Sequence, residues 1–438
     1  ARYFGVAAPE RTYVDGSMIS QIYRSDPERL KAYAMDDVRE TDAISGLLSP
    51  SYFYQAQLIP FSYQNCVTRG NATRIDALLC AEYMQENAAL PSPQAPRPFQ
   101  GGLTDALHTG VYRNVWHADV RSLYPSIIIS RGLVPRVDHL GVYPRLLERL
   151  RGFRLAAKDA MSSGPPSRRA HFEALQSSFK ILINSFYGYA GFPQGSFNDY
   201  DLAETVTGEG RRILQSMVDL LQNQQATVIE IDTDGIYFVP PADVTAQDDM
   251  QARIQAILPD GIDIDLDSTY AAMLAYKAKN YALLGHDGAV SITGAALKSR
   301  GLEPFQRDYI REMITLLLLE RGAEADALLE RNQHAIREHL LPLASFAKRE
   351  VLSTPPRVYA EKLAAGTTRR SAAYELALGS TREYKQGDTV LFYVTGEKKS
   401  VSVSDAAKLL SDAAPGLRDE NVPYYSDKLD KLHRKFSD

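Results

Sequence analysis

The chain has 438 residues, of which 45% are hydrophobic and 24% are charged, with a formal net charge of −5. These values are ordinary for a globular protein of about three domains, and they exclude a chain with membrane spans because no apolar run is long enough. Cys66 and Cys80 are too few for a disulfide framework, so we expect a reducing cytoplasm. The start at Ala1, without methionine or signal-peptide pattern, suggests a fragment or a processed chain.

Residues 1–48 are expected to be helical, because Asp26-Pro27-Glu28 is a favourable helix start. Residues 49–110 are richer in proline, glycine and polar residues. Four prolines between residues 91 and 98 predict a loop or linker there, since proline removes a backbone donor. The pair Gly101-Gly102 then precedes an apolar strand that ends at Asp119, the first residue of D-V-R-S-L-Y-P-S-I.

Residues 141–190 predict two helices separated by Gly164-Pro165-Pro166. Arg154 and Lys158 share one face of the first helix. Lys180, Asn184 and Tyr187 share one face of the second, so we expect an antiparallel hairpin with polar groups on its inner faces. A plain surface hairpin with solvated basic residues is the alternative.

A helix is expected at about 202–221, followed by apolar runs at 227–231 and 236–239 that flank Asp232-Thr233-Asp234-Gly235. This pattern predicts a β-hairpin with both aspartates at its tip, where their role is either to make the turn or to bind a ligand. The remaining chain is expected to be helical at 309–320 and 323–340, with a strand at 389–395.

Carboxylates at neighbouring strand ends can hold a pair of divalent cations, which clamp the attacking and leaving oxygens of a phosphoryl transfer. Mg²⁺ suits such a site because its other ligands are water and phosphate oxygens. Arg154, Lys158 and Lys180 could neutralise a triphosphate. The sequence contains no Walker-type loop, no Cys/His metal cluster and no glycine-flanked serine nucleophile.

At this point the chain resembles the catalytic half of a family B DNA polymerase. The segments that start at Asp119, at Lys180 (K-I-L-I-N-S-F-Y-G) and at Asp232 (D-T-D) are similar to motifs A, B and C of that family, in the same order. The resemblance implies an α+β right-hand architecture with an antiparallel palm sheet, helical-hairpin fingers and a mostly helical thumb. The implied domains are an exonuclease remnant at 1–48, palm at 49–140 and 199–303, fingers at 141–198 and thumb at 304–438.

The resemblance also implies template-directed DNA synthesis with two Mg²⁺ ions, which Mn²⁺ could replace. Primer–template DNA and deoxynucleoside triphosphates are the expected partners, and a processivity clamp is a further candidate. No membrane association is expected. If the source is bacterial, the protein would associate with the nucleoid. Asp119, Asp234 and the Val120 carbonyl would bind the metal ions. Of the two hairpin aspartates, Asp232 would have the less strictly required role. The nucleotide would contact Ser122, Leu123, Tyr124, Arg154, Lys158, Lys180, Asn184 and Tyr187. DNA would contact Gly101, Gly102, Lys279, Tyr281, Lys298 and Arg300.

Several positions depart from the family pattern. Glu230 and Ile231 stand where Tyr-Gly is frequent, Gly235 stands where Ser is frequent, and Ala278 replaces a common lysine. In the N-terminal segment, Tyr33 to Asp37 resembles the third exonuclease motif, but the first two motifs are not in this sequence. We therefore expect no proofreading.

Two other functions remain open. A polymerase relic would bind primer–template DNA without synthesis, which the departure at Glu230 allows but the intact Asp119, Lys180 and Asp234 disfavour. A two-metal nuclease is disfavoured by the helix with triphosphate-binding residues, which a nuclease does not need.

Overall fold

The computed structural model describes residues 1–14, 16–165, 168–298, 301–414, 416 and 418–437. The chain forms two compact units, each built from three separate stretches of sequence. Unit 1 contains Ala1–Leu103, Val120–Gln215 and Ile257–Ile264. Unit 2 contains Thr104–Asp119, Ser216–Ala256 and Asp265–Asp438. Within the described residues, no helix combines the length and the apolar character needed to cross a lipid bilayer.

Unit 1 consists mainly of helices. They are α1 (Ile19–Ser25), α2 (Pro27–Leu58), α3 (Tyr63–Thr68), α4 (Asn71–Gln85), α5 (Leu123–Ser130), α6 (Val142–Ser163), α7 (Arg169–Ala190) and the first part of α8 (Tyr200–Asn223), with 3-10 turns at Arg2–Phe4 and Gly16–Met18. The predicted start of α2 is confirmed, because Pro27 is its first residue and Asp26 accepts a hydrogen bond from the Arg29 N–H.

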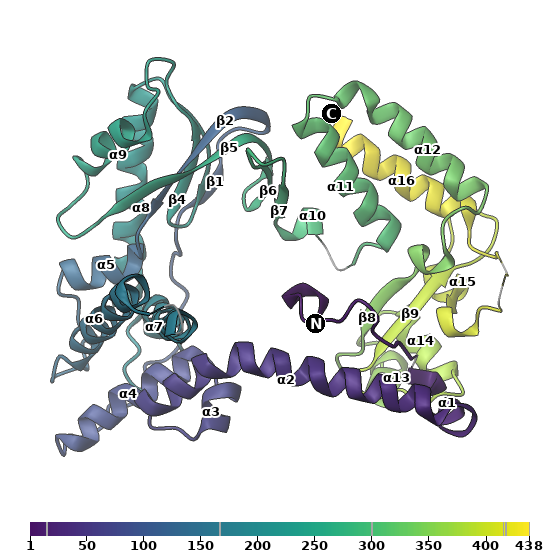
Figure 1. Cartoon of the computed structure of the whole chain (residues 1–438), viewed down its shortest axis with the longest axis horizontal. Coiled ribbons are helices and arrows are strands. Elements are labelled where there is room, and N and C mark those ends of the chain that lie inside the picture. Colours follow the sequence, from purple (N-terminus) through teal and green to yellow (C-terminus); the bar gives the residue numbers. More distant parts are fainter. Residues whose placement is uncertain (15, 166–167, 299–300, 415, 417, 438) are drawn as a thin grey trace. The chain divides into compact units, whose positions relative to one another are not determined.

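The sequence analysis named no helix between residues 49 and 85, yet α2 continues through Pro50 to Leu58, and α3 and α4 follow. Residues 91–98 form neither helix nor strand, as their prolines predicted. Helices α6 and α7 pack against each other as the predicted hairpin (Figure 1). Buried side chains on each helix, such as Leu147 on α6 and Phe186 on α7, explain this packing.

Unit 2 contains a seven-stranded sheet with the order β1-β3-β4-β2-β5-β6-β7. Its strands are β1 (Thr104–Ala106), β2 (Gly110–Val120), β3 (Thr227–Asp232), β4 (Gly235–Val239), β5 (Ile264–Lys277), β6 (Asn280–Leu284) and β7 (Val290–Thr293). Every pairing that involves β3, β4 or β6 is antiparallel. Helices α9 (Gln247–Gln255) and α10 (Ala295–Lys298) also belong to unit 2, and Figure 1 shows α9 beside the sheet.

The C-terminal part of unit 2 is mostly helical. It contains α11 (Pro304–Leu318), α12 (Ala325–Arg337), α13 (Pro356–Ala364), α14 (Ala372–Gly379), α15 (Val403–Ala406) and α16 (Val422–Ser437), 3-10 turns at Gly322–Glu324, Leu343–Phe346 and Leu410–Asp412, and a sheet with the order β10 (Ala407–Leu409), β9 (Thr389–Val394), β8 (Lys348–Val351). Helices α11, α12 and α16 lie side by side (Figure 1). Their buried side chains share one core with β5 and β6, which anchors this part to the large sheet.

Candidate active site

An acidic turn joins two strands of the large sheet. Strand β3 ends at Asp232 and β4 begins at Gly235, and Thr233 between them has a φ of 66°. The Asp234 N–H donates a hydrogen bond of 2.7 Å to the Asp232 carbonyl, which closes the turn. The hairpin predicted from the two apolar runs is therefore confirmed.

Asp119 is the neighbour of this turn. In the sheet register, Asp119 of β2 faces Gly235 of β4, and Gly235 faces Asp232 of β3 on its other side. Opposed residues in antiparallel strands have Cα atoms about 4.5–5.5 Å apart. The two acidic segments, which are more than a hundred residues apart in the sequence, thus meet at one end of the three strands.

The aspartates at the end of these strands are suited to Mg²⁺, which needs few protein ligands. They are less suited to a metal ion that is bound by protein ligands alone. Among the described residues, no three His, Cys, Asp or Glu side chains are grouped so as to hold a metal ion. Mg²⁺ typically takes one or two carboxylates and completes its shell with water and substrate phosphates. Aspartates gathered at one end of neighbouring strands are consistent with that chemistry.

Gly235 is required here by its neighbour His117. A Cβ atom at position 235 would lie 2.4 Å from His117 Nε2 and 3.2 Å from the Ala118 carbonyl oxygen. The His117 ring in turn stacks on Tyr237, with ring centroids 4.2 Å apart. The sequence analysis noted that glycine replaces serine, and the structure supplies the reason, because the His117 ring occupies the space of a side chain.

Glu230 is a buried carboxyl group behind the acidic turn. Its side chain has no solvent exposure, and its Oε1 accepts a hydrogen bond of 2.6 Å from the Lys279 N–H. Its Oε2 is buried and has no hydrogen-bond partner among the described residues. Burial raises the pKa of Glu230 to about 7, and the nearby Asp232 acts in the same direction, while the Lys279 N–H opposes them.

The predicted primer-binding residues Lys279 and Tyr281 contact the acidic turn itself. Lys279 Nζ donates a hydrogen bond of 2.7 Å to Thr233 Oγ1 and lies 3.4 Å from Asp232 Oδ1. The Tyr281 hydroxyl donates to Asp232 Oδ2 at 3.2 Å. Burial raises the pKa of Tyr281, so this hydroxyl remains a donor at neutral pH.

In unit 1, Tyr124 is held between two helices. Its ring centroid lies 4.5 Å from that of Tyr187 on α7, and a Cβ atom on Gly210 of α8 would lie 3.0 Å from Tyr124 Cε1. Ser122, with a φ of 50°, is the N-terminal cap of α5, and Leu123 is buried. Tyr124 and Tyr187, both predicted as nucleotide-binding residues, are therefore in contact.

The remaining nucleotide-binding candidates lie on α6 and α7. Lys158, Lys180 and Asn184 are exposed, whereas Arg154 is half-buried. Arg154 Nε is buried and has no hydrogen-bond partner among the described residues, and burial lowers the pKa of this guanidinium. Arg154 thus has an unused donor on the helical hairpin.

The other DNA-binding candidates are dispersed. Arg211 of α8 donates from Nη1 to the Gly101 carbonyl, and Gly102 beside it is exposed. Lys298 is the exposed last residue of α10, whereas Arg300 lies outside the described residues.

The exonuclease-like segment is engaged in an ionic network of its own. Arg11 forms an ion pair with Asp37 and donates to Glu40 Oε1 at 2.6 Å. The Thr12 N–H donates to Asp36 Oδ2 at 2.9 Å. A hydrogen bond to Asp37 raises the pKa of Tyr33.

Comparison with known families identifies the chain. The model of DNA polymerase family B matches residues 131–431, which is well over half of the chain. The chain belongs to DNA polymerase family B. The resemblance inferred from the three sequence motifs is therefore confirmed.

Two DNA polymerases give the extent of the sequence similarity. A DNA polymerase of Archaeoglobus fulgidus is 26% identical over 325 residues, which cover 69% of this chain and 41% of that protein. The DNA polymerase alpha catalytic subunit of Oryza sativa subsp. japonica is 33% identical over 241 residues, or 48% of this chain and 15% of that protein. The chain thus spans about two fifths of the length of the archaeal relatives it matches.

A solved structure of the family B DNA polymerase from Pyrobaculum calidifontis has the same fold. It is similar with a TM-score of 0.74 and 21% identity, and the similarity covers 100% of this chain and 60% of that one. The predicted α+β polymerase fold with an antiparallel sheet is confirmed.

The sequence analysis missed one residue in each unit that shapes the surroundings of a predicted site residue or of its neighbour. Gly210 provides the room for Tyr124, and His117 fills the space beside Gly235. A glycine inside a helix costs about 1 kcal/mol relative to alanine, so Gly210 in α8 was a signal of close approach. His117 offered no comparable signal, because a histidine in a strand is usually a packing residue.

Proposed function

We propose that this chain catalyses template-directed DNA synthesis, by transfer of a nucleotide from a deoxynucleoside triphosphate to a primer 3′-hydroxyl. Family membership supports the reaction class. The observation that carries the proposal is the register of β2 against β4. In this register Asp119 lies opposite Gly235, which is the residue directly after Asp234 in the sequence. Two acids that are remote in sequence and adjacent in space are what a metal-assisted phosphoryl transfer requires.

Asp119 and Asp234 would hold two Mg²⁺ ions together with the Val120 carbonyl, and Asp232 would support them. When bound, the ions would stabilise negative charge on the attacking and leaving oxygens. In the reaction, the primer 3′-oxygen forms a bond to the α-phosphorus, the bond to pyrophosphate breaks, and the hydroxyl proton passes to solvent.

The roles proposed for unit 1 are binding and selection of the nucleotide. Arg154, Lys158 and Lys180 would neutralise the triphosphate and the leaving pyrophosphate. Tyr124 would lie under the sugar and exclude a 2′-hydroxyl. Its contacts with Tyr187 and Gly210 support this role, because a ring held on two sides cannot move aside. The backbone at Ser122 and Leu123 would also contact the phosphates, and Asn184 and Tyr187 would line the new base pair.

Lys279 and Tyr281 would hold the primer strand near its end. Their bonds to Asp232 and Thr233 support this role, because they fix both side chains beside the acidic turn. DNA farther from the primer end would be contacted by Lys298, Arg300, Gly101 and Gly102.

The proposed activity does not include proofreading. An exonuclease needs carboxylates that are free to bind metal ions. The ion pair between Asp37 and Arg11 supports the absence of such a site, since a carboxylate neutralised by a guanidinium is a poor metal ligand.

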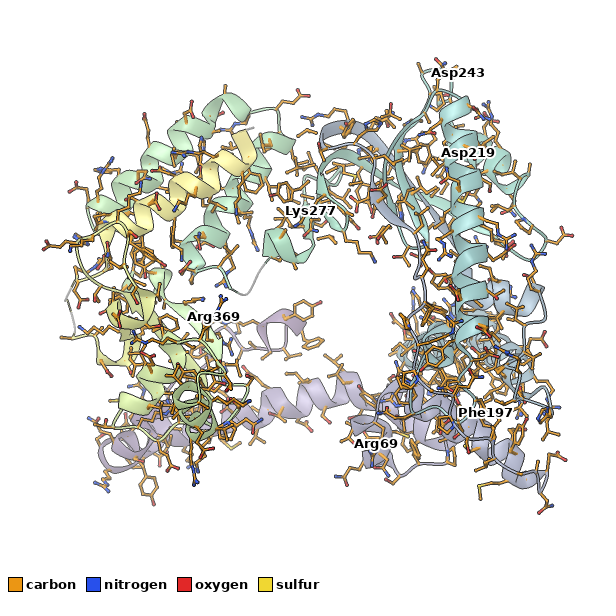
Figure 2. All side chains as sticks on the ribbon, turned by 180° about the vertical axis from the view of Figure 1, so that it is seen from behind. Arg69, Phe197, Asp219, Asp243, Lys277 and Arg369 are labelled. Carbon is orange, nitrogen blue, oxygen red and sulfur yellow. The ribbon has the colours of Figure 1, made fainter. Side chains whose placement is uncertain are left out.

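Primer extension with Mg²⁺ and deoxynucleotides tests the proposed synthesis. Asp234→Ala should abolish extension without loss of DNA binding. Asp243→Ala is the matched control, because Asp243 is an exposed aspartate on a turn after β4 (Figure 2). Primer–template binding without extension in the wild-type chain would refute the proposal and support a binding protein instead.

A further inference from the structure

A pocket of about 680 Å³ lies in unit 1, and none of its lining residues is assigned a role above. It is lined by the second half of α2, the connection between α3 and α4, the start of α4, and α7 between Ala170 and Ile181. Its lining includes Tyr52, Gln55, Arg69, Asn71 and Arg74. The pocket is large enough for a group of ligand size rather than a single water.

Arg74 is a buried cation in this lining, and no carboxylate of the described residues lies within ion-pair distance of it. Only 5% of the residue is exposed, and its Nη1 donates to two neutral acceptors, Gln55 Oε1 and Asn71 Oδ1, each at 2.7 Å. Its Nε is buried and lacks a hydrogen-bond partner among the described residues. The Arg74 Cζ also lies 5.7 Å from the centroid of the Tyr52 ring, a cation–π contact that offsets part of the cost of burial. A guanidinium does not lose its proton in a protein, so burial without an anion is still costly.

The start of α4 adds a second positive feature to the same pocket. The helix has 15 residues, its N-terminal cap Gly70 offers no side-chain hydrogen bond, and its first turn has no acidic residue. Gly70 and Asn71 both line the pocket. The exposed N–H groups of a helix start favour an anion, in part through the helix dipole.

Arg69 places a second guanidinium directly before this helix. It is exposed, it lines the pocket, and Figure 2 labels it. No carboxylate of the described residues lies within ion-pair distance of Arg69 or Arg74, although the exposed Glu173 of α7 also lines the pocket. Charge at this pocket is therefore predominantly positive.

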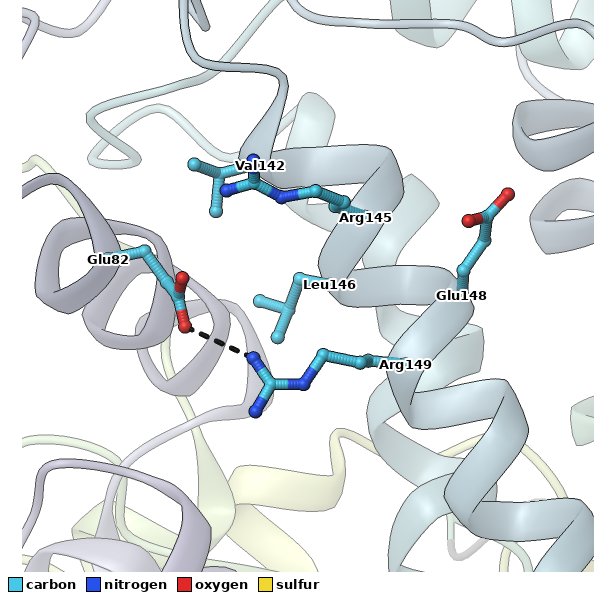
Figure 3. A pocket seen from close by; sticks show the side chains of 6 residues that line it. All are labelled: Glu82, Val142, Arg145, Leu146, Glu148 and Arg149. Carbon is cyan, nitrogen blue, oxygen red and sulfur yellow. Dashed lines mark hydrogen bonds and ion pairs between the residues drawn. The ribbon is translucent and has the colours of Figure 1, made fainter. Parts of the chain in front are cut away.

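In a second pocket, positive and negative side chains are balanced. It measures about 220 Å³ and is lined by Arg145 and Arg149 together with Glu82 and Glu148 (Figure 3). Arg149 is paired with Glu82 at 3.4 Å. The two arginines of this second pocket are balanced by two glutamates in the same lining, so the lining has no excess positive charge to attract an anion.

We propose that the pocket around Arg74 binds a phosphate group. Phosphate matches both features, because guanidinium groups bind its oxygens in pairs and helix starts donate backbone N–H groups to it. The phosphate could belong to a DNA strand or to a free phosphate compound, and the chemistry of recognition is the same for both. The site is distinct from the proposed metal site, so its test does not depend on synthesis.

Calorimetric titration of the full chain with sodium phosphate, against sodium chloride at equal ionic strength, measures the binding. Arg69→Gln tests the site without risk to the fold, because Arg69 is exposed, and should weaken phosphate binding several-fold. Arg74→Gln should weaken it by about tenfold or more, and Glu173→Gln should strengthen it. Arg145→Gln is the matched control and should leave it unchanged.

Anisotropy of a labelled single-stranded oligonucleotide separates the two sources. If Arg69→Gln weakens oligonucleotide binding more than Arg145→Gln does, the phosphate belongs to a strand. If only inorganic phosphate is affected, the ligand is a free phosphate compound. Phosphate binding that is absent in the wild-type chain, or equal in Arg69→Gln and Arg145→Gln, would overturn the proposal.

Discussion

Replacement of Glu230 by glutamine should change how stability depends on pH. Glutamine retains an oxygen that can accept the hydrogen bond from the Lys279 N–H and has nearly the same volume, but it cannot ionise. The wild-type carboxyl is fully buried and has a pKa of about 7, compared with 4.5 for an ordinary glutamate. The substitution therefore removes the titration, and the amide nitrogen takes the place of Oε2, which has no hydrogen-bond partner among the described residues.

The magnitude follows from the two pKa values of Glu230. They differ by about 2.5 pKa units, which corresponds to about 3 kcal/mol. Between pH 4.5 and about 7, the folded chain keeps a proton that the unfolded chain has released, so unfolding releases a proton in this window. The free energy of unfolding must then fall as pH rises, and the stabilising contribution present below pH 4.5 is lost as pH passes about 7.

Urea unfolding at several values between pH 5 and pH 8 measures this effect. Trp116 is the only tryptophan, and it lies in β2 opposite Phe238 of β4, so its fluorescence reports on the sheet that contains Glu230. The free energy of unfolding of Glu230→Gln relative to that of the wild type should rise by about 2–3 kcal/mol between pH 5 and pH 8, whatever constant cost the buried amide adds. A difference between the two proteins that stays constant across this range, as is expected for the exposed-site control Asp243→Asn, would refute the reasoning.

Three further outcomes are expected. Tyr124→Ala should allow primer extension with ribonucleotides, and unchanged sugar selectivity in that assay would contradict the proposed role of Tyr124. Binding of primer–template DNA, measured by anisotropy, should weaken steeply with salt because phosphate contacts release counterions, whereas a flat response would exclude the basic residues as the binding track. Glu420 is buried, which raises its pKa, but hydrogen bonds from Arg418 and His339 outweigh burial and lower it. Glu420→Gln should therefore cost about 1–3 kcal/mol in urea unfolding at pH 7, and the cost should shrink as pH falls through the carboxylate range.

Local patterns predicted the elements that carry the site. The Asp-Gly turn between two apolar runs predicted β3 and β4, and the proline-containing break predicted α6 and α7. Helix α4 was also predictable from the sequence, because Ile75, Leu78 and Leu79 follow the spacing of an amphipathic helix. The glycine and proline content of residues 49–110 as a whole obscures that signal.

The proximity of Asp119 to the acidic turn had no local signal. It depends on the pairing of β2 with β4, whose residues are more than a hundred positions apart in the sequence. Periodicity reports which face of a strand is buried, but it does not report which strand lies beside it. The resemblance to family B polymerases carried that part of the prediction.

The burial of Glu230 follows from strands that are covered on both faces, which the alternation of side chains along one strand does not reveal. Four consecutive residues of β3 are buried, and Glu230 is one of them. Strand β4, whose register against β2 is regular, also has four consecutive buried residues. The register of β3 against β4 also shifts between Val228 and Glu230, and a bulge of this kind has no signal in the sequence.

Lys279 connects Glu230 to the acidic turn. It has a φ of 58°, and this left-handed backbone presents its N–H to Glu230 while its Nζ contacts Thr233 and Asp232. An ionised Glu230 would add a negative charge near Asp232, and that repulsion is one of the causes that raise its pKa. Below about pH 7 the protonated carboxyl avoids this charge and still accepts the Lys279 hydrogen bond. The buried acid therefore fixes the backbone of Lys279 without competing with Asp232 for its ammonium group.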